Sequence, residues 1–169
     1  MKDTIDALEL LKDQHDEVED LISEIEDSDD TAKKEELFRE LADKIAAHST
    51  IEEKIFYPSV MADQTEDMLI ESTEEHLVVK RVLADMLEMD ADDEHFDAKL
   101  KVLKENIRHH ARDEEEEKLF PIVRRQLSAD QLAGLGNEML AMFEMLLERE
   151  PRMNVPSETA EAAPLEMSH

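Results

Sequence analysis

Residues 31–58 read TAKKEELFRELADKIAAHSTIEEKIFYP, and this stretch carries the pattern that decides the fold. Its apolar side chains return at the spacing of one helix face, at Leu37, Leu41, Ile45 and Ile55. This period is typical of an amphipathic helix. His48 and Glu52 occupy the two intervening positions on that face. The spacing therefore predicts a helix over about residues 31–57, ending before Pro58, that turns a histidine and a carboxylate toward the core.

Four other segments have the same period, and short polar breaks separate them. We expect helices at about residues 4–26, 65–89, 94–120 and 128–150. Ser128 followed by Gln131 has the pattern of a capping box, which marks the start of the last helix. Four long amphipathic helices with short links predict an all-α fold, an up-down-up-down four-helix bundle with an additional C-terminal helix.

The last part of the chain differs in composition. Residues 151–169 read PRMNVPSETAEAAPLEMSH, with three prolines and little apolar periodicity. We therefore assign residues 1–150 to the helical bundle and expect residues 151–169 to be a disordered acidic tail.

The charge and the composition exclude several classes of function. The chain of 169 residues has 46 acidic and 19 basic residues and a formal net charge of −27, which disfavours nucleic acids and anionic membranes as partners. It has no cysteine for a disulfide or a thiol nucleophile, and two glycines are too few for a phosphate-binding loop. No apolar run suits a membrane span or a signal peptide, so we expect a soluble cytoplasmic protein. The sequence indicates no protein partner.

Each of the four long helices places one histidine on its apolar face, and two of them add a carboxylate about one turn later. The histidines are His15, His48, His76 and His110. The carboxylates are Glu52 and either Glu114 or Glu115. A single inward histidine is usually an ordinary core residue, but buried ionisable groups must be paired or coordinated, and this acidic chain has few cations to pair them. Imidazoles and carboxylates converging from four helices suit two ions of iron, manganese or zinc.

The three remaining histidines are not assigned to the metal. His109 points about 100° away from His110 on an ideal helix. His95 lies at a helix start in an acidic loop, and His169 lies in the tail.

These residues resemble the motifs of the hemerythrin-like proteins, the HHE cation-binding domains. The likeness rests on His15, on HSTIEEKIFYP at residues 48–58, on Glu75-His76 and on HARDEEEEKLFP at residues 110–121. The resemblance covers about residues 1–150 and implies a non-haem di-iron site inside an antiparallel bundle. It implies two iron ions bridged by an oxo or hydroxo group and by carboxylates of the second and fourth helices. It also implies that His48 and His110 are terminal ligands, with His15 and His76 completing the two shells.

One departure from the family pattern lies in the third helix. Oxygen-carrying hemerythrins have a second histidine one turn after the ligand of that helix, and Lys80 stands there in this chain. A protonated lysine does not ligate a metal, so we expect one iron to keep an open or water-filled position. This favours reaction with peroxide or other small oxidants over reversible oxygen carriage. Alternatively, Lys80 extends to solvent or pairs with a neighbouring acid.

The other departure leaves two candidates for the carboxylate of the fourth helix. The segment from His110 to its proline is one residue longer than the segment from His48 to its proline. Either Glu114 ligates at the regular spacing of four residues, or Glu115 ligates across a π-bulge. Apolar side chains follow Glu115 at helical spacing, so Glu115 is the first choice and Glu114 the second.

The sequence therefore favours a non-haem di-iron protein that binds dioxygen or reacts with peroxide or a related oxidant. The alternative is a module that binds or stores iron, or senses oxygen or iron, without turnover. Nitric-oxide defence or iron-centre repair is disfavoured, because family members of that kind often carry an additional cysteine-containing domain. A metal-free structural bundle is a further alternative. The sequence leaves open whether the protein is an enzyme.

Overall fold

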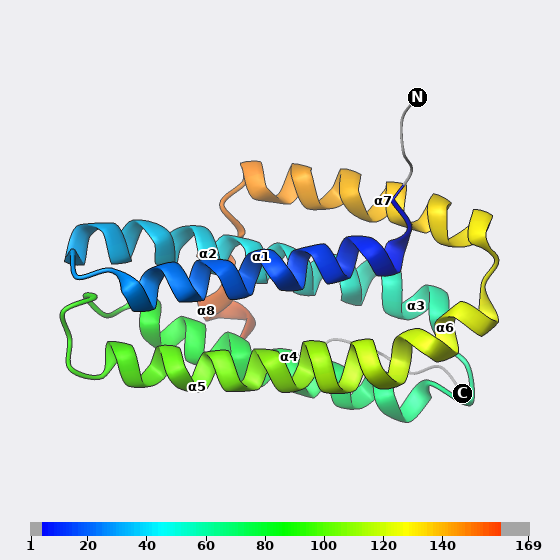
Figure 1. Ribbon diagram of the computed structural model, residues 1–169, viewed down its shortest axis with the longest axis horizontal. Helices are drawn as coiled ribbons and strands as arrows, with labels where there is room; N and C mark the ends of the chain where they lie inside the picture. Colours follow the sequence, from blue (N-terminus) through cyan, green and yellow to red (C-terminus); the bar gives the residue numbers. More distant parts are fainter. Residues whose placement is uncertain (1–4, 160–169) are drawn as a thin grey trace.

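Four long antiparallel helices form the body of the computed structural model, which describes residues 5–159 (Figure 1). They are α1 (Ala7–Asp27), α2 (Thr31–Ile51), α4 (Glu66–Leu87) and α5 (Phe96–Arg108). Asp6 caps α1 by accepting a hydrogen bond from the Glu9 N–H, and Asp30 caps α2 by accepting from the Ala32 N–H. The predicted all-α bundle is confirmed.

Two of the long helices continue beyond the expected ends through turns of π-helix. α2 passes into η1 (Glu52–Phe56) and α3 (Tyr57–Val60), and α5 passes into η2 (His109–Leu119) and α6 (Phe120–Gln126). The expectation that the helix ends before Pro58 was therefore wrong. Immediately before each proline, an N–H bonds to the carbonyl five residues earlier, from Tyr57 to Glu52 and from Phe120 to Glu115. The wider turn makes room for a proline ring that would clash inside an α-helix.

The apolar core is divided into two clusters along the bundle. One contains Ile22, Leu41, Leu83 and Leu103. The other contains Leu11, Ile51, Leu69 and Leu119. On each long helix, the inward histidine lies between a residue of one cluster and a residue of the other. A polar layer therefore separates the two apolar halves of the bundle.

Helix α7 (Ala129–Glu148) lies along the outside of the bundle against α1 and α2 (Figure 1). Ser128 accepts a hydrogen bond from the Gln131 N–H and the Gln131 side chain accepts one from the Ser128 N–H, so the expected capping box is present. No helix within residues 5–159 combines the length and the apolar character needed to cross a bilayer.

The first residues of the expected tail are folded. η3 (Pro151–Asn154) and α8 (Val155–Glu158) follow α7 and pack against α2 and α4. Val155 is fully buried in the first apolar cluster, and the Arg152 guanidinium donates to Asp43 at 2.8 Å. The expectation of disorder was therefore wrong for residues 151–159, because apolar burial and ion pairing hold the segment against the bundle. Residues 160–169 lie outside the described part.

We predict opposite effects from alanine at the two glycines of α7. A Cβ at Gly136 would lie 2.5 Å from the Ile5 carbonyl oxygen, so Gly136→Ala should lower the free energy of unfolding by about 1–3 kcal/mol. A Cβ at Gly134 meets nothing within 4 Å, so Gly134→Ala should raise it by about 0.5–1 kcal/mol through helix propensity. Urea unfolding followed by circular dichroism measures both. Equal stabilities of the two variants would contradict the close contact between α7 and the start of α1.

Candidate metal centre

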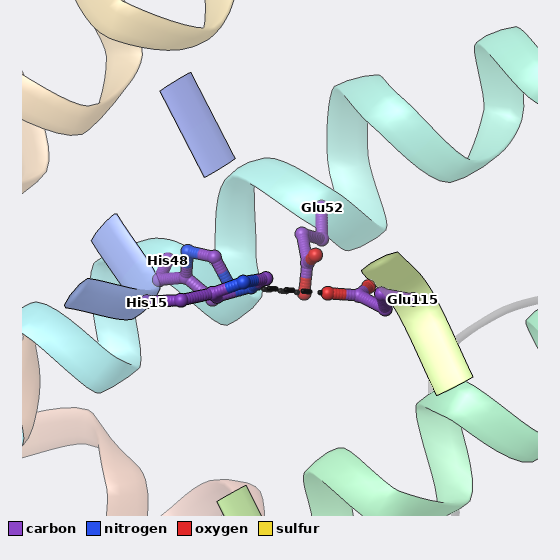
Figure 2. A group of neighbouring side chains, drawn as sticks. All are labelled: His15, His48, Glu52 and Glu115. Atoms are coloured by element: carbon purple, nitrogen blue, oxygen red, sulfur yellow. Dashed lines mark ion pairs between the residues drawn. The ribbon is translucent and has the colours of Figure 1, made fainter. Parts of the chain in front are cut away.

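Six of the seven candidate ligands lie together in the polar layer. They form two groups that share Glu52. The first group is His15, His48, Glu52 and Glu115, and the second is Glu52, His76 and His110. The side chains of the first group point toward one another (Figure 2). Within each group the ligand atoms lie within 4.8 Å of one another. Because metal bonds to nitrogen and oxygen are about 2.0–2.2 Å long, donors this close can share an ion.

The two carboxylates lie between the imidazoles. His48 Nε2 lies 3.4 Å and His76 Nε2 2.9 Å from the same oxygen, Oε1 of Glu52. His15 Nε2 lies 3.2 Å from Oε1 of Glu115, and His110 Nε2 lies 3.5 Å from its Oε2. His15 and His48 form one pair of imidazoles, and His76 and His110 form the other. Each carboxylate therefore faces at least one imidazole of each pair.

The structure brings Glu115 into the cluster and leaves Glu114 outside it. Glu115 is fully buried in η2. The Glu114 carboxylate instead accepts a hydrogen bond from Lys118 at 3.2 Å and lies 3.6 Å from His109. The π-helical geometry of η2 thus gives the five-residue spacing from His110 that was the first choice.

A second set of side chains fixes the orientation of every imidazole. In each case the Nδ1 atom, on the far side of the ring from the cluster, is hydrogen-bonded to a residue on another helix. The pairs are His15 with Glu116 at 2.6 Å, His48 with Gln14 at 2.6 Å, His76 with Glu53 at 2.6 Å and His110 with Glu75 at 2.8 Å. We call these four acceptors the anchor residues. Such partners set the tautomer of a metal-binding histidine and aim Nε2 at the ion.

The sequence analysis gave the anchor residues no role. Each is the immediate chain neighbour of a candidate ligand, but it holds a histidine of a different helix. Gln14 of α1 holds His48 of α2, for example, and Glu53 of η1 holds His76 of α4. A polar residue beside each ligand was the available signal, although only the packed helices show which histidine it reaches.

The buried charges shift the pKa values of the cluster. Burial opposes protonation of His15, but the Glu115 carboxylate near its Nε2 and the hydrogen bond to Glu116 outweigh burial and raise the pKa of His15 to about 9. Burial lowers the pKa of His48 well below its ordinary value. Burial also opposes protonation of His110, but the carboxylates of Glu115, Glu52 and Glu75 together outweigh burial and raise the pKa of His110 well above its ordinary value. In the protein alone, protons on imidazoles balance the carboxylates, and a bound cation would take over this role.

A separate observation also fits a metal at the cluster, since several of its buried donor atoms lack a hydrogen-bond partner. His15 Nε2, Glu52 Oε2 and Glu115 Oε1 are buried without a hydrogen-bond partner in the described part of the chain. Buried polar atoms are normally satisfied, so unpartnered ones need an explanation. All three belong to the first group of candidate ligands, and a cation bound there would satisfy them.

Two further buried residues, Tyr57 and Lys80, lie beside the cluster and its anchor residues. Tyr57 is fully buried, and its hydroxyl donates a hydrogen bond to Oε2 of Glu115 at 2.6 Å. Lys80 is buried and pairs with acids, its Nζ lying 3.9 Å from Glu53 and 3.9 Å from Glu158. Tyr57 is therefore more than a packed aromatic ring, and Lys80 follows the ion-pair alternative.

The two unassigned histidines within residues 5–159, His109 and His95, lie apart from the cluster. His109 is half exposed, with Nε2 3.4 Å from Glu75, and forms a surface group with Glu75 and Glu71. His95 is exposed beside Asp93. His169 lies outside the described residues.

Comparison with known proteins gives the fold and the family. A solved structure of a hemerythrin HHE cation-binding domain-containing protein from Mycobacterium kansasii superimposes with a TM-score of 0.76, at 24% sequence identity, over 86% of this chain and 89% of that one. This likeness shows the fold. A curated protein of Nostoc sp., named as a DNA nickase, is 26% identical over 148 residues, which are 88% of this chain and 42% of that protein. The chain thus spans less than half the length of this relative.

The family assignment comes from the match to the profile of the hemerythrin HHE cation-binding domain over residues 6–123. This match covers most of the chain and contains all six clustered residues. The chain therefore belongs to the hemerythrin HHE cation-binding domain family.

Proposed function

We propose that the six clustered residues hold two iron ions and that the site binds dioxygen or reacts with peroxide. The observation that carries the proposal is a small cavity against the cluster, about 30 Å³ in volume, which all four histidines line. Its other walls include the apolar side chains of Val18, Ile45, Val79 and Ile107. Because one water needs about 10–15 Å³, the cavity suits a molecule of about two or three heavy atoms.

The number of ions follows from the two groups of ligands. The first group offers four donors and the second offers three, with Glu52 common to both. A carboxylate shared in this way suits a bridge between two ions, as in other dinuclear sites. Both groups fall short of six donors, which supports open positions for a small ligand. Lys80 adds none, since its ammonium pairs with Glu53 and Glu158.

Bound iron would supply the electrons for reduction of an oxidant. The chain's own residues would control the site in three ways. The anchor residues hold the imidazoles in position, and the apolar walls limit entry of bulk water. Tyr57 holds Oε2 of Glu115 through its hydroxyl, which restricts that carboxylate to one orientation.

The partners and the location of the chain remain proposals. The Nostoc relative is named as a DNA nickase, but a net charge of −27 opposes contact with phosphates, so we propose no nucleic-acid partner. A cytoplasmic location stays a prediction. Storage or sensing of iron without turnover is the competing function, and it differs in its response to oxidants.

We predict that Glu115→Gln and Glu114→Gln differ sharply in metal binding. Glu115→Gln should weaken binding by more than the roughly 10–100-fold that loss of an outer partner causes, because it removes a ligand. Glu114→Gln makes the same chemical change one residue away, outside the cluster, and should leave two ions per chain. Metal analysis after gel filtration, with titration of apo-protein by ferrous iron under anaerobic conditions, measures both. Equal retention by the two variants would contradict the assignment of Glu115.

We predict a reaction of the reduced, iron-loaded protein with oxidants. Addition of dioxygen or peroxide to the anaerobic protein should change its visible absorption, and Glu52→Gln should abolish the change through loss of metal. A change reversed by removal of oxygen indicates binding, whereas continued consumption of peroxide indicates turnover. A protein that retains two irons and responds to neither oxidant would support storage or sensing and overturn the proposal.

A further inference from the structure

One buried amide beside the cluster has a free hydrogen-bond donor. Gln14 is 4% exposed, and its side chain lines the same cavity as the four histidines. Its Nε2 atom is buried and has no hydrogen-bond partner among residues 5–159. An unsatisfied buried N–H is unfavourable, because it has lost its hydrogen bonds to water. This position therefore needs an explanation.

The bond to His48 fixes the direction of the amide. His48 turns Nε2 toward Glu52, at 3.4 Å, so its Nδ1 carries the proton when Nε2 binds a metal. That Nδ1–H donates to Oε1 of Gln14 at 2.6 Å. Only the oxygen of the amide can accept this bond. The nitrogen must then occupy the other branch of the side chain, where it keeps both of its hydrogens.

Gln14 is also the exception among the anchor residues. The other three are the carboxylates of Glu53, Glu75 and Glu116. An ionised carboxylate only accepts hydrogen bonds, whereas an amide can both hold the histidine and donate to something else. Apart from the four histidines and Ser49, the other residues of the cavity wall are apolar, and the amide of Gln14 is a wall group with an unused hydrogen-bond donor.

We propose that Nε2 of Gln14 donates a hydrogen bond to the small ligand in the cavity and so selects ligands whose outer atom is a good acceptor. This rests on the proposed function, because it requires a small ligand at the metal site. Hydroperoxide, superoxide and azide are anions whose outer atom can accept a hydrogen bond, so they would be favoured. Gln14 is thus a specificity-determining residue for the ligand in addition to a support for His48.

Azide binding to the ferric, iron-loaded protein tests this role, with two variants that separate the two ends of the amide. Gln14→Glu keeps an acceptor for His48 and removes the donor. Gln14→Met is close in length, neutral, and removes both. Thr50→Ala, which changes a half-buried polar residue of α2 outside the cavity, is the control. Visible absorption gives the azide affinity, and metal analysis gives the iron content of each protein.

We expect both Gln14 variants to bind azide about tenfold more weakly than the wild type, since one hydrogen bond to a charged ligand is lost. Thr50→Ala should bind azide as the wild type does. Weakening in Gln14→Glu alone would reflect repulsion of an anion and would overturn the inference. Unchanged affinity in Gln14→Met would overturn it as well, while the iron site would stand. A wild type that retains no iron, or binds iron but no azide, would instead refute the proposed function.

Loss of iron from both variants would shift the test to the wild type. In zinc-loaded protein, which is diamagnetic, the side-chain amide protons of Gln14 can be followed by NMR after labelling of glutamine with nitrogen-15. Azide should move one of these protons downfield and protect it from exchange. Azide binding that leaves the Gln14 amide signal unchanged would overturn the inference.

Discussion

The structure depends on two carboxylates, Glu52 and Glu115, that lie fully buried at mid-bundle. A charge in this environment is strongly unfavourable unless positive charge and hydrogen bonds surround it. The four imidazoles lie around the pair. Burial would raise the pKa of Glu52, but its contacts with Glu115, His110 and His76 outweigh burial and hold that pKa below its usual range. Replacing any one of these groups by an apolar side chain would leave its partners uncompensated, so the cluster is retained or lost as a unit.

The compensation extends outward in layers of alternating charge. The anchor carboxylates outside the imidazoles are negative again, and cations hold two of them. Arg112 donates to Glu116 at 2.6 Å and to Asp16 of α1 at 2.6 Å, and Lys80 lies 3.9 Å from Glu53. These contacts also join helices that are distant in sequence. The chain's excess of acids is therefore partly structural, because the site needs a negative outer layer to keep its histidines oriented.

The sequence predicted well which side chains point into the core, but predicted poorly which side chains contact a neighbouring helix. Helical period alone placed His15, His48 and Glu52 on core faces, because burial of one face is what the period reports. Gln14 and Glu53 could not be recognised in this way, since each lies beside the face and reaches a histidine on the next helix. The packing of Val155 escaped notice for a related reason. A single apolar side chain has no period, and its burial depends on a gap that only the folded bundle presents.

The two π segments explain why the site lies where the helices are irregular. In an α-helix, residues five apart point about 140° away from each other, whereas a π turn brings them onto one face. In η2 this aligns Glu115 with His110, and in η1 it aligns Tyr57 with Glu52. The two side chains aligned in this way contact each other, because the Tyr57 hydroxyl donates a hydrogen bond to Glu115. The same residues in regular α-helices would form a similar bundle, but Glu115 and Tyr57 would point away from the imidazoles. The extra residue before Pro121 is therefore a requirement of the site, and the register of the helix follows from the carboxylate that must reach the interior.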